Sequence, residues 1–255
     1  MKEPVVIMGI GEMGKIFAGG FLRAGHPVYP VTREMDLTRE ATLIPGPELV
    51  LVAVAETELR PALDRMPETW RDRVCLLQNE LLPRDWRDHH IVRPTVVAVW
   101  LEKKKGRDVH VILPSPVYGP KAGLIVAALG SLEIPAIEVG DAGEMLYEMV
   151  RKNLYILTAN IMGLVTRCRV GELWSGHRAL AREVAGEVLD VQEWLARESL
   201  PRERVIAGMV EAFQADPDHE CAGRTARERL DRTLRNADEA GLAVSRLRGI
   251  HSDLS

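Results

Sequence analysis

The chain has 255 residues, of which 46% are hydrophobic and 27% are charged, and its formal net charge at pH 7 is -4. This composition is typical of a globular protein with a substantial core and excludes disordered, collagen-like and disulfide-stapled classes. The net negative charge provides no general attraction to nucleic acid or anionic membranes, so we expect neither partner. No apolar run approaches the ~20 residues of a membrane span, and the three cysteines lack metal-site or disulfide-framework spacing. We therefore expect a cytoplasmic protein without a bound metal.

Residues 1–140 alternate short apolar runs with helical patterns, as is typical of parallel strands joined by crossover helices. From Gly143 onward the sequence shows long helical periodicities and few β-branched runs. The predicted fold class is α/β, with a Rossmann-type, mostly parallel sheet in residues 1–140 and an all-helical domain in residues 141–255. The predicted strands are 5–8, 28–31, 49–54, 74–78, 95–101, 109–113 and 136–139.

The connection over residues 32–48 is too short to hold both a full helix and a full strand of a standard βαβ unit. We therefore expect the usual third strand of such a sheet to be short or missing. Pro30 agrees with this, because a proline cannot donate a ladder hydrogen bond and is tolerated mainly near a sheet edge.

A glycine-rich loop follows the first predicted strand and precedes a helical stretch, with the spacing G-x-G-x-x-G. Gly9 would allow the tight turn, Gly11 the close approach of a pyrophosphate, and Gly14 the close packing of helix on strand. The helix N-terminus offers N–H groups and a partial positive charge to phosphates. The alternative is a glycine-rich turn without a ligand. The residues expected to bind a dinucleotide here are Gly9, Ile10, Gly11, Glu12, Met13 and Gly14.

The end of the second strand indicates which dinucleotide is bound. NAD sites usually place Asp or Glu there for the ribose 2′-OH, whereas NADP sites place an Arg for the 2′-phosphate. Here Thr32 and Arg33 follow the strand, which favours NADP(H). Glu34 and Asp36 lie close by and weaken this interpretation, because an acidic residue there is typical of NAD sites. Arg33 could instead be a solvated surface residue.

The helix predicted after Gly143 carries polar residues inside or beside its apolar arc. Asn153 and Asn160 fall within the arc, and Lys152 lies at its margin. Such groups are costly to bury unless they are paired. One explanation is hydrogen bonding between helices, with Lys152 extending to water. The other is a cleft in which a lysine donates a proton and an asparagine orients a carbonyl substrate.

Several segments occur in an order that covers most of the chain: the loop at 9–14, Leu77-Gln78-Asn79-Glu80, Ile134-Pro135-Ala136-Ile137-Glu138-Val139, and Arg151-Lys152-Asn153-Leu154, which leads through Asn160 to Gly171-Glu172-Leu173. In these segments the chain resembles the ketopantoate reductase (2-dehydropantoate 2-reductase) family of the 6-phosphogluconate-dehydrogenase-like reductases. The resemblance implies that Lys152 is the general acid, that Asn79 lies beside the nicotinamide ribose and the substrate, and that Asn160 binds the substrate.

The chain departs from this family's pattern mainly at positions near the substrate. Glu80 replaces the glycine of the family's Q-N-G, Ala55 replaces a common lysine, and the segment 221–225 stands where the family's substrate-binding serine is expected. The function we expect is an NADPH-dependent reductase that transfers hydride to the carbonyl of a small 2-oxo acid. The alternatives are a related dehydrogenase or imine reductase with another substrate, and a catalytically silent NADP-binding sensor. The helical domain could pack on its own chain or form a homodimer.

Overall fold

The computed structural model describes residues 2–103, 105–221, 223 and 225–254. The chain divides into two compact units, Met1–Glu148 and Met149–Ser255. The first contains a mostly parallel sheet with its helices and the second is helical, which confirms the predicted fold class. The division falls inside one long helix, and the assignment of functional domains to residues 1–140 and 141–255 stays a prediction.

Seven strands form the sheet of the first unit in the order β2-β1-β3-β4-β5-β8-β9. All neighbours pair in parallel except β5 and β8, which are antiparallel. A separate antiparallel hairpin joins β6 and β7. The strands are β1 (Val5–Met8), β2 (Val28–Val31), β3 (Leu49–Val52), β4 (Val74–Leu76), β5 (Thr95–Val97), β6 (Leu101–Glu102), β7 (His110–Val111), β8 (Ser115–Tyr118) and β9 (Ala136–Glu138).

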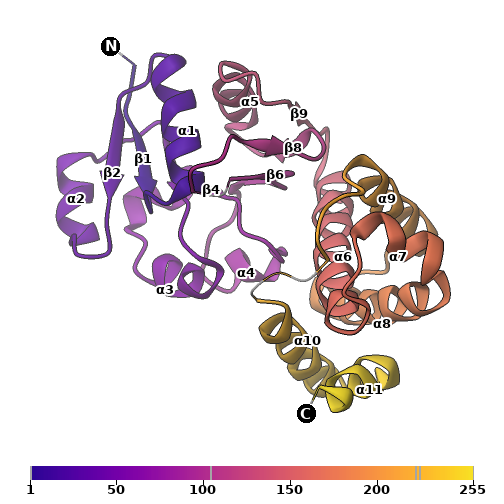
Figure 1. Ribbon diagram of the computed structural model, residues 1–255. Coiled ribbons are helices and arrows are strands. Elements are labelled where there is room, and N and C mark those ends of the chain that lie inside the picture. Colours follow the sequence, from indigo (N-terminus) through magenta and orange to yellow (C-terminus); the bar gives the residue numbers. More distant parts are fainter. Residues whose placement is uncertain (1, 104, 222, 224, 255) are drawn as a thin grey trace. The chain divides into compact units, whose positions relative to one another are not determined.

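Helices connect these strands, and Figure 1 shows α1 and α5 side by side against the sheet. The chain runs from β1 through α1 to β2 in one direction across the sheet, and from β3 through α3 to β4 in the other direction. Because crossovers between parallel strands are right-handed, α1 and α3 cover opposite faces of the sheet. The connecting elements are α1 (Glu12–Arg23), α2 (Leu37–Leu43), the 3-10 helix η1 (Glu56–Glu58), α3 (Leu59–Asp64), the 3-10 helix η2 (Glu68–Arg73), α4 (Arg84–Arg87) and α5 (Ala122–Gly130).

Successive residues of each strand face opposite layers of the core, because side chains alternate along a strand. Val5 and Ile7 of β1 belong to the cluster that contains Phe17 and Phe21 of α1 and Ile125 of α5. The intervening strand residues face the other layer, and they are buried as well. A sheet covered on both faces therefore requires the continuous apolar runs that identified β1 and β3 in the sequence.

The second strand lies at the edge of the sheet, as predicted. β2 pairs only with β1, and residues 32–48 contain α2 but no strand beyond it. Pro30 lies opposite Ile7 in this ladder. The Tyr29 hydroxyl donates to the carboxylate of Glu40, which fastens α2 to the edge strand.

The strand predictions after residue 94 were partly wrong. The strand expected at 95–101 ends at residue 97, and the run at 109–113 contributes only a two-residue strand to the hairpin. β8 was not predicted, because prolines such as Pro114 and Pro116 are atypical of a strand. Pro116 lacks a ladder donor, yet its carbonyl accepts from the N–H of Ala98, and this contact begins the antiparallel pairing with β5.

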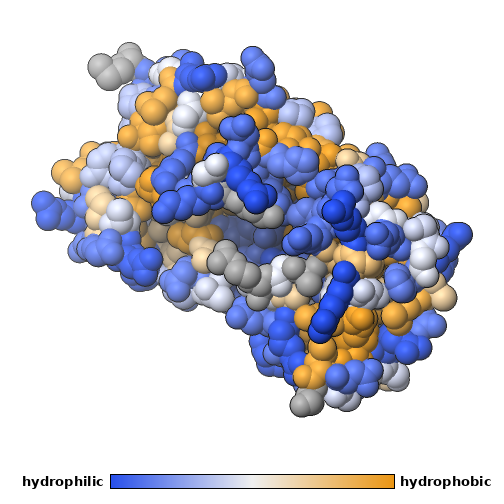
Figure 2. Space-filling view, in the orientation of Figure 1, coloured by the Kyte–Doolittle hydropathy of each residue, from blue (hydrophilic) through white to orange (hydrophobic). Residues whose placement is uncertain are grey.

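The second unit consists of helices with charged outer surfaces and apolar inner faces. They are α6 (Ala142–Thr166), whose first residues belong to the first unit, α7 (Val170–Gly176), α8 (Arg178–Ala196), α9 (Arg202–Ala215), α10 (Ala226–Ala240) and α11 (Ser245–Asp253). The helix predicted after Gly143 is thus confirmed. Figure 2 shows both hydrophilic residues and apolar patches on one face of the molecule. Across the described residues, no helix is both long and apolar enough to cross a membrane.

Candidate functional site

The glycine loop forms a tight connection between β1 and α1. Gly9 adopts φ +95°, and a Cβ on it would lie 2.7 Å from the carbonyl oxygen of Ala53, just after β3. A Cβ on Gly14 would overlap the carbonyl oxygen of Gly9. Both positions therefore require glycine, one for its conformation and both for close packing. The roles predicted for Gly9 and Gly14 agree with this geometry.

Gly11 differs from the other two glycines of the motif because, beyond the adjacent chain, no described atom lies within 4 Å of the Cβ it would carry. It is the N-cap of α1, and its φ of -71° is open to any residue. The helix begins with Glu12, and the first intrahelical bond in this turn runs from the Lys15 N–H to the Gly11 carbonyl. The preceding N–H groups have no intrahelical acceptor, so the helix presents donors at an open position.

This loop lies where the direction of the sheet's winding reverses. From β1 the chain proceeds to β2 on one side, and it then returns to β3 on the other side of β1. Ligands of open α/β sheets bind outside the carboxyl ends of the strands at this point. The carboxyl end of β1 carries the glycine loop, that of β2 carries Thr32 and Arg33, and that of β4 leads to Asn79.

Two acidic residues near the end of β2, Glu34 and Asp36, could bind a ribose 2′-OH, and they have different environments. Asp36 caps α2, with its carboxylate accepting from the Thr38 N–H at 3.0 Å. Glu34 lies 3.9 Å from the Arg33 guanidinium, and the Arg33 side chain is 92% exposed. A hydrogen bond from the Thr32 side chain is the main cause that lowers the pKa of Glu34. Asp36 therefore has a structural role, while Arg33 and Glu34 both point to solvent.

The end of β4 is fastened to the end of β3 by Gln78. Its amide Nε2 donates to the carbonyl oxygens of Val52 at 2.6 Å and Val54 at 3.3 Å, and the side chain is buried. Asn79, next in the chain, is half-buried at the rim. Glu80 then adopts φ +59°, the left-handed region that favours glycine. The sequence singled out Asn79 but missed the anchoring role of Gln78, whose signal was a polar residue directly after a buried strand.

In the second unit, the polar residues of α6 have distinct environments. Asn153 is buried and donates to Gln192 of α8 at 2.9 Å, so it joins two helices, as one of the two explanations anticipated. Lys152 is 5% exposed, so the other part of that explanation, in which Lys152 extends to water, was wrong. Asn160 is half-buried; its Nδ2 donates to the Ile156 carbonyl at 2.8 Å, and its Oδ1 accepts from the Gly223 N–H at 3.3 Å. Among the described residues, these two contacts use one N–H and one lone pair of the Asn160 amide, which has a second of each. Ala222 and Arg224, of the segment expected near the substrate, lie outside the described residues.

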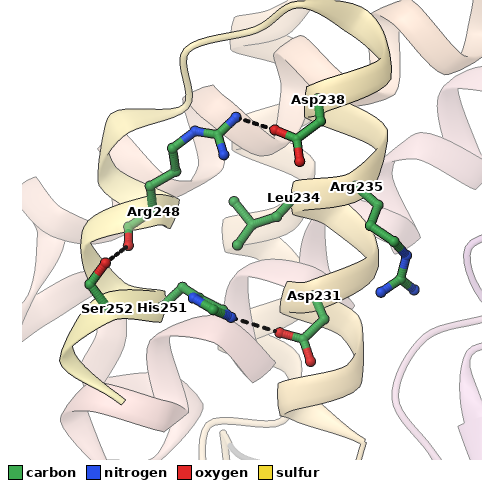
Figure 3. Close-up of a pocket in the computed structure, with 7 residues that line it drawn as sticks. All are labelled: Asp231, Leu234, Arg235, Asp238, Arg248, His251 and Ser252. Atoms are coloured by element: carbon green, nitrogen blue, oxygen red, sulfur yellow. Dashed lines mark hydrogen bonds and ion pairs between the residues drawn. The ribbon is translucent and has the colours of Figure 1, made fainter. Parts of the chain in front are cut away.

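A hollow of about 440 Å³ between α10 and α11 brings together none of the predicted site residues. Its charges pair with one another across the two helices, and Arg235 points away from α11 (Figure 3). Arg248 lies 2.6 Å from Asp238, and His251 lies 3.1 Å from Asp231. This is the pattern of an ion-paired helix contact. Within the described part of the chain, no group of three or more His, Cys, Asp and Glu side chains is placed to hold a metal ion.

Several solved structures share this architecture. A ketopantoate reductase from Ralstonia eutropha matches with a TM-score of 0.68 at 19% identity, over 98% of this chain and 97% of that one. The chain has the ketopantoate reductase fold. A D-mandelate dehydrogenase in complex with NADH matches with a TM-score of 0.68 at 14% identity, over 98% and 97% of the two chains. A dimeric ketopantoate reductase from Staphylococcus aureus matches with a TM-score of 0.66 at 15% identity, with the same coverage. No family model and no curated protein sequence matches.

The left-handed backbone at Glu80 predicts an effect on stability. Replacing Glu80 by Gly removes the cost of a side chain at positive φ, about 1–2 kcal/mol, and adds about 0.5–1 kcal/mol of glycine entropy. Glu80→Ala is the matched control, because it also deletes the carboxylate but keeps a Cβ. We expect urea unfolding to show Glu80→Gly more stable than Glu80→Ala by about 0.5–1 kcal/mol. If Glu80→Gly were instead less stable than Glu80→Ala by the roughly 0.5–1 kcal/mol of glycine entropy, the turn would be unstrained.

Proposed function

We propose that this protein is an NADP(H)-dependent reductase of ketopantoate-reductase type that reduces the carbonyl of a small 2-oxo acid. The observation that carries the proposal is the turn at 9–14, where two glycines are sterically required and Gly11 is left beside open space. The fold supports it, since one structure of this fold is a D-mandelate dehydrogenase complex with NADH and anilino(oxo)acetate. That structure matches with a TM-score of 0.65 at 13% identity.

The chain fits a dinucleotide at the carboxyl edge of its sheet. The N–H groups at the start of α1 would hold the pyrophosphate, and Arg33 would meet a 2′-phosphate through a charge-assisted hydrogen bond. The capping role of Asp36 supports this choice, since its carboxylate is already occupied. Bound there, the dinucleotide supplies the hydride. The proposed cofactor-binding residues are Gly9, Ile10, Gly11, Glu12, Met13, Gly14, Thr32, Arg33 and Asn79.

The proposed catalytic residues are Lys152, Asn79 and Asn160. A protonated Lys152 would stabilise negative charge on the substrate's carbonyl oxygen and then give that oxygen its proton. The remaining donor of the Asn160 amide would orient the same substrate. The burial of Lys152 supports this role, because an ammonium group held away from water interacts more strongly with a developing charge. A homodimer stays part of the proposal, in keeping with the dimeric S. aureus reductase.

The loop geometry predicts that Gly11→Val prevents cofactor binding without unfolding the protein. The Cβ of a valine at Gly11 would meet no described atom beyond the adjacent chain, and the side chain would fill the space assigned to the pyrophosphate. Gly14→Ala is the contrasting variant, because its new methyl group collides with the backbone of Gly9. We expect calorimetric titration to show no NADPH binding by Gly11→Val at an unchanged Tm, and Gly14→Ala to have a lower Tm. Normal NADPH affinity in a folded Gly11→Val protein would show that the pyrophosphate does not bind at this loop.

Arg33 predicts the preference between the two dinucleotides. Arg33→Ala should weaken NADPH binding by roughly 10- to 150-fold, corresponding to about 1.5–3 kcal/mol for a hydrogen bond to a charged group. NADH lacks the 2′-phosphate, so its dissociation constant serves as the internal control and should stay unchanged. Fluorescence titrations with both dinucleotides measure this. If the unmutated protein binds both equally, the preference does not exist.

Lys152 separates the reductase from a silent binding protein. Lys152→Met keeps most of the buried side-chain volume and removes the proton donor, whereas Lys152→Ala removes both. A general acid contributes about 10²–10⁴-fold in rate, so both variants should lose this factor in single-turnover reduction at saturating NADPH. If packing alone matters, Lys152→Met should react at nearly the normal rate.

A panel of 2-oxo acids, β-keto acids and cyclic imines tested with the unmutated protein distinguishes the remaining alternatives. Reduction of a 2-oxo acid supports the proposal. Selective reduction of another class assigns the same chemistry to a different substrate. Tight NADPH binding with no turnover on the panel favours the sensor.

A further inference from the structure

Two free cysteines of the helical unit face each other across a short stretch of paired backbone. Arg169 and Glu220 form an antiparallel bridge. The next pair outward in this register is Cys168 and Cys221, and the Cys221 N–H donates to the Cys168 carbonyl at 3.4 Å. The two cysteines are far apart in the sequence, but the backbone holds them directly opposite.

This register suits a disulfide. Directly opposite residues of an antiparallel pair point to the same face, and in a hydrogen-bonded pair their Cα atoms are about 5.5 Å apart. Disulfides span Cα separations of roughly 4.4–6.8 Å, so the backbone need not move far to join the sulfurs. The thiols already interact: burial first, and then the charge and hydrogen bonding of Cys168, raise the pKa of Cys221 to about 12.

The two thiols differ in their access to solvent. Cys168 is half-buried, lies between the exposed Arg167 and Arg169, and is 3.2 Å from the Thr166 hydroxyl. Cys221 is only 2% exposed. An oxidant in solution therefore meets Cys168 first, and Cys221 is held beside it as the second thiol. Cys75, the remaining cysteine, is fully buried in β4 of the other unit.

We propose that Cys168 and Cys221 are a redox modification site that forms a reversible intramolecular disulfide when the protein meets a peroxide. The Cys168 sulfur attacks the peroxide, breaks its O–O bond and becomes a sulfenic acid, with release of water or an alcohol. The Cys221 sulfur then attacks the Cys168 sulfur and forms the S–S bond, and the sulfenic hydroxyl leaves as water with the Cys221 proton. Two thiols are oxidised and one peroxide is reduced. A dithiol reductant reverses the reaction.

The disulfide would tie the residues after α6 to the segment that contacts Asn160. Cys168 follows the end of α6 by two residues, and Cys221 precedes Gly223, whose N–H donates to Asn160, by two residues. Oxidation thus restrains the backbone beside a proposed substrate residue, a consequence that rests on the proposed function. The bond also closes a loop of about 50 residues, which restricts the unfolded chain. We expect a Tm several degrees higher in the oxidised protein.

The test counts thiols before and after treatment of the full chain with a small excess of hydrogen peroxide. In denaturant, three thiols per chain should react with a thiol reagent before treatment, one should react afterwards, and dithiothreitol should restore three. Peptide mapping without reductant should find Cys168 linked to Cys221, with Cys75 as the remaining thiol. Hydrogen exchange at the Gly223 amide should slow in the oxidised protein. None of these readouts requires enzymatic activity, so their failure is distinguishable from failure of the proposed reductase.

Three variants make the assignment specific. Cys168→Ser should keep both remaining thiols, and Cys221→Ser should lose only Cys168, as a sulfenic acid without a cross-link. Cys75→Ala is the matched control and should still form the disulfide. The proposal is overturned if Cys168 in the unmutated protein oxidises beyond the sulfenic acid without linking to Cys221. It is equally overturned if the bond joins two chains, or if Cys168→Ser still loses two thiols.

Discussion

The close approach of three backbone segments at Gly9, Gly14 and Ala53 is the constraint on which the first unit depends. β1 lies between β2 and β3, and the turn that follows β1 passes close to the backbone of Ala53, just after β3. The turn must then reverse direction within a few residues and begin α1 against its own backbone. This sets the axis of α1, and with it the direction in which the free N–H groups at its start point.

The same constraint extends along α1 to the strands at the other end of the sheet, β8 and β9. One face of α1 packs so closely on α5 that a Cβ at Gly20 would lie 2.5 Å from the Ala128 carbonyl oxygen. α5 in turn connects β8 to β9. The small residues of α1 therefore couple the glycine turn to β8 and the edge strand β9, which lie beyond the antiparallel pairing of β5 and β8. A dinucleotide at the turn would be held by a rigid frame rather than by a mobile loop.

The sequence predicted what local patterns determine and missed what depends on tertiary partners. The strand, glycine turn and helix at residues 5–23 follow from a spacing that few other structures tolerate, and Pro30 marked the sheet edge through its missing donor. β8 was missed because a proline-containing strand is recognisable only by the strands beside it. Helix-to-helix pairing of Asn153 was one of two explanations, but its partner Gln192 depends on where α8 lies, which no periodicity encodes. The capping by Asp36 is local, and its signal was an aspartate directly before a helical stretch.

The rim residue Asn79 illustrates how the fold can tolerate local strain at a proposed site. On its N-terminal side, Gln78 holds two carbonyls at the end of β3, and on its C-terminal side Glu80 turns the chain through positive φ. A non-glycine residue persists in that conformation only where the surrounding structure fixes the backbone. The buried Gln78 provides such fixing, so the position of Asn79 is set from the sheet outward. A residue other than glycine at position 80 therefore affects the stability of the turn more than its geometry.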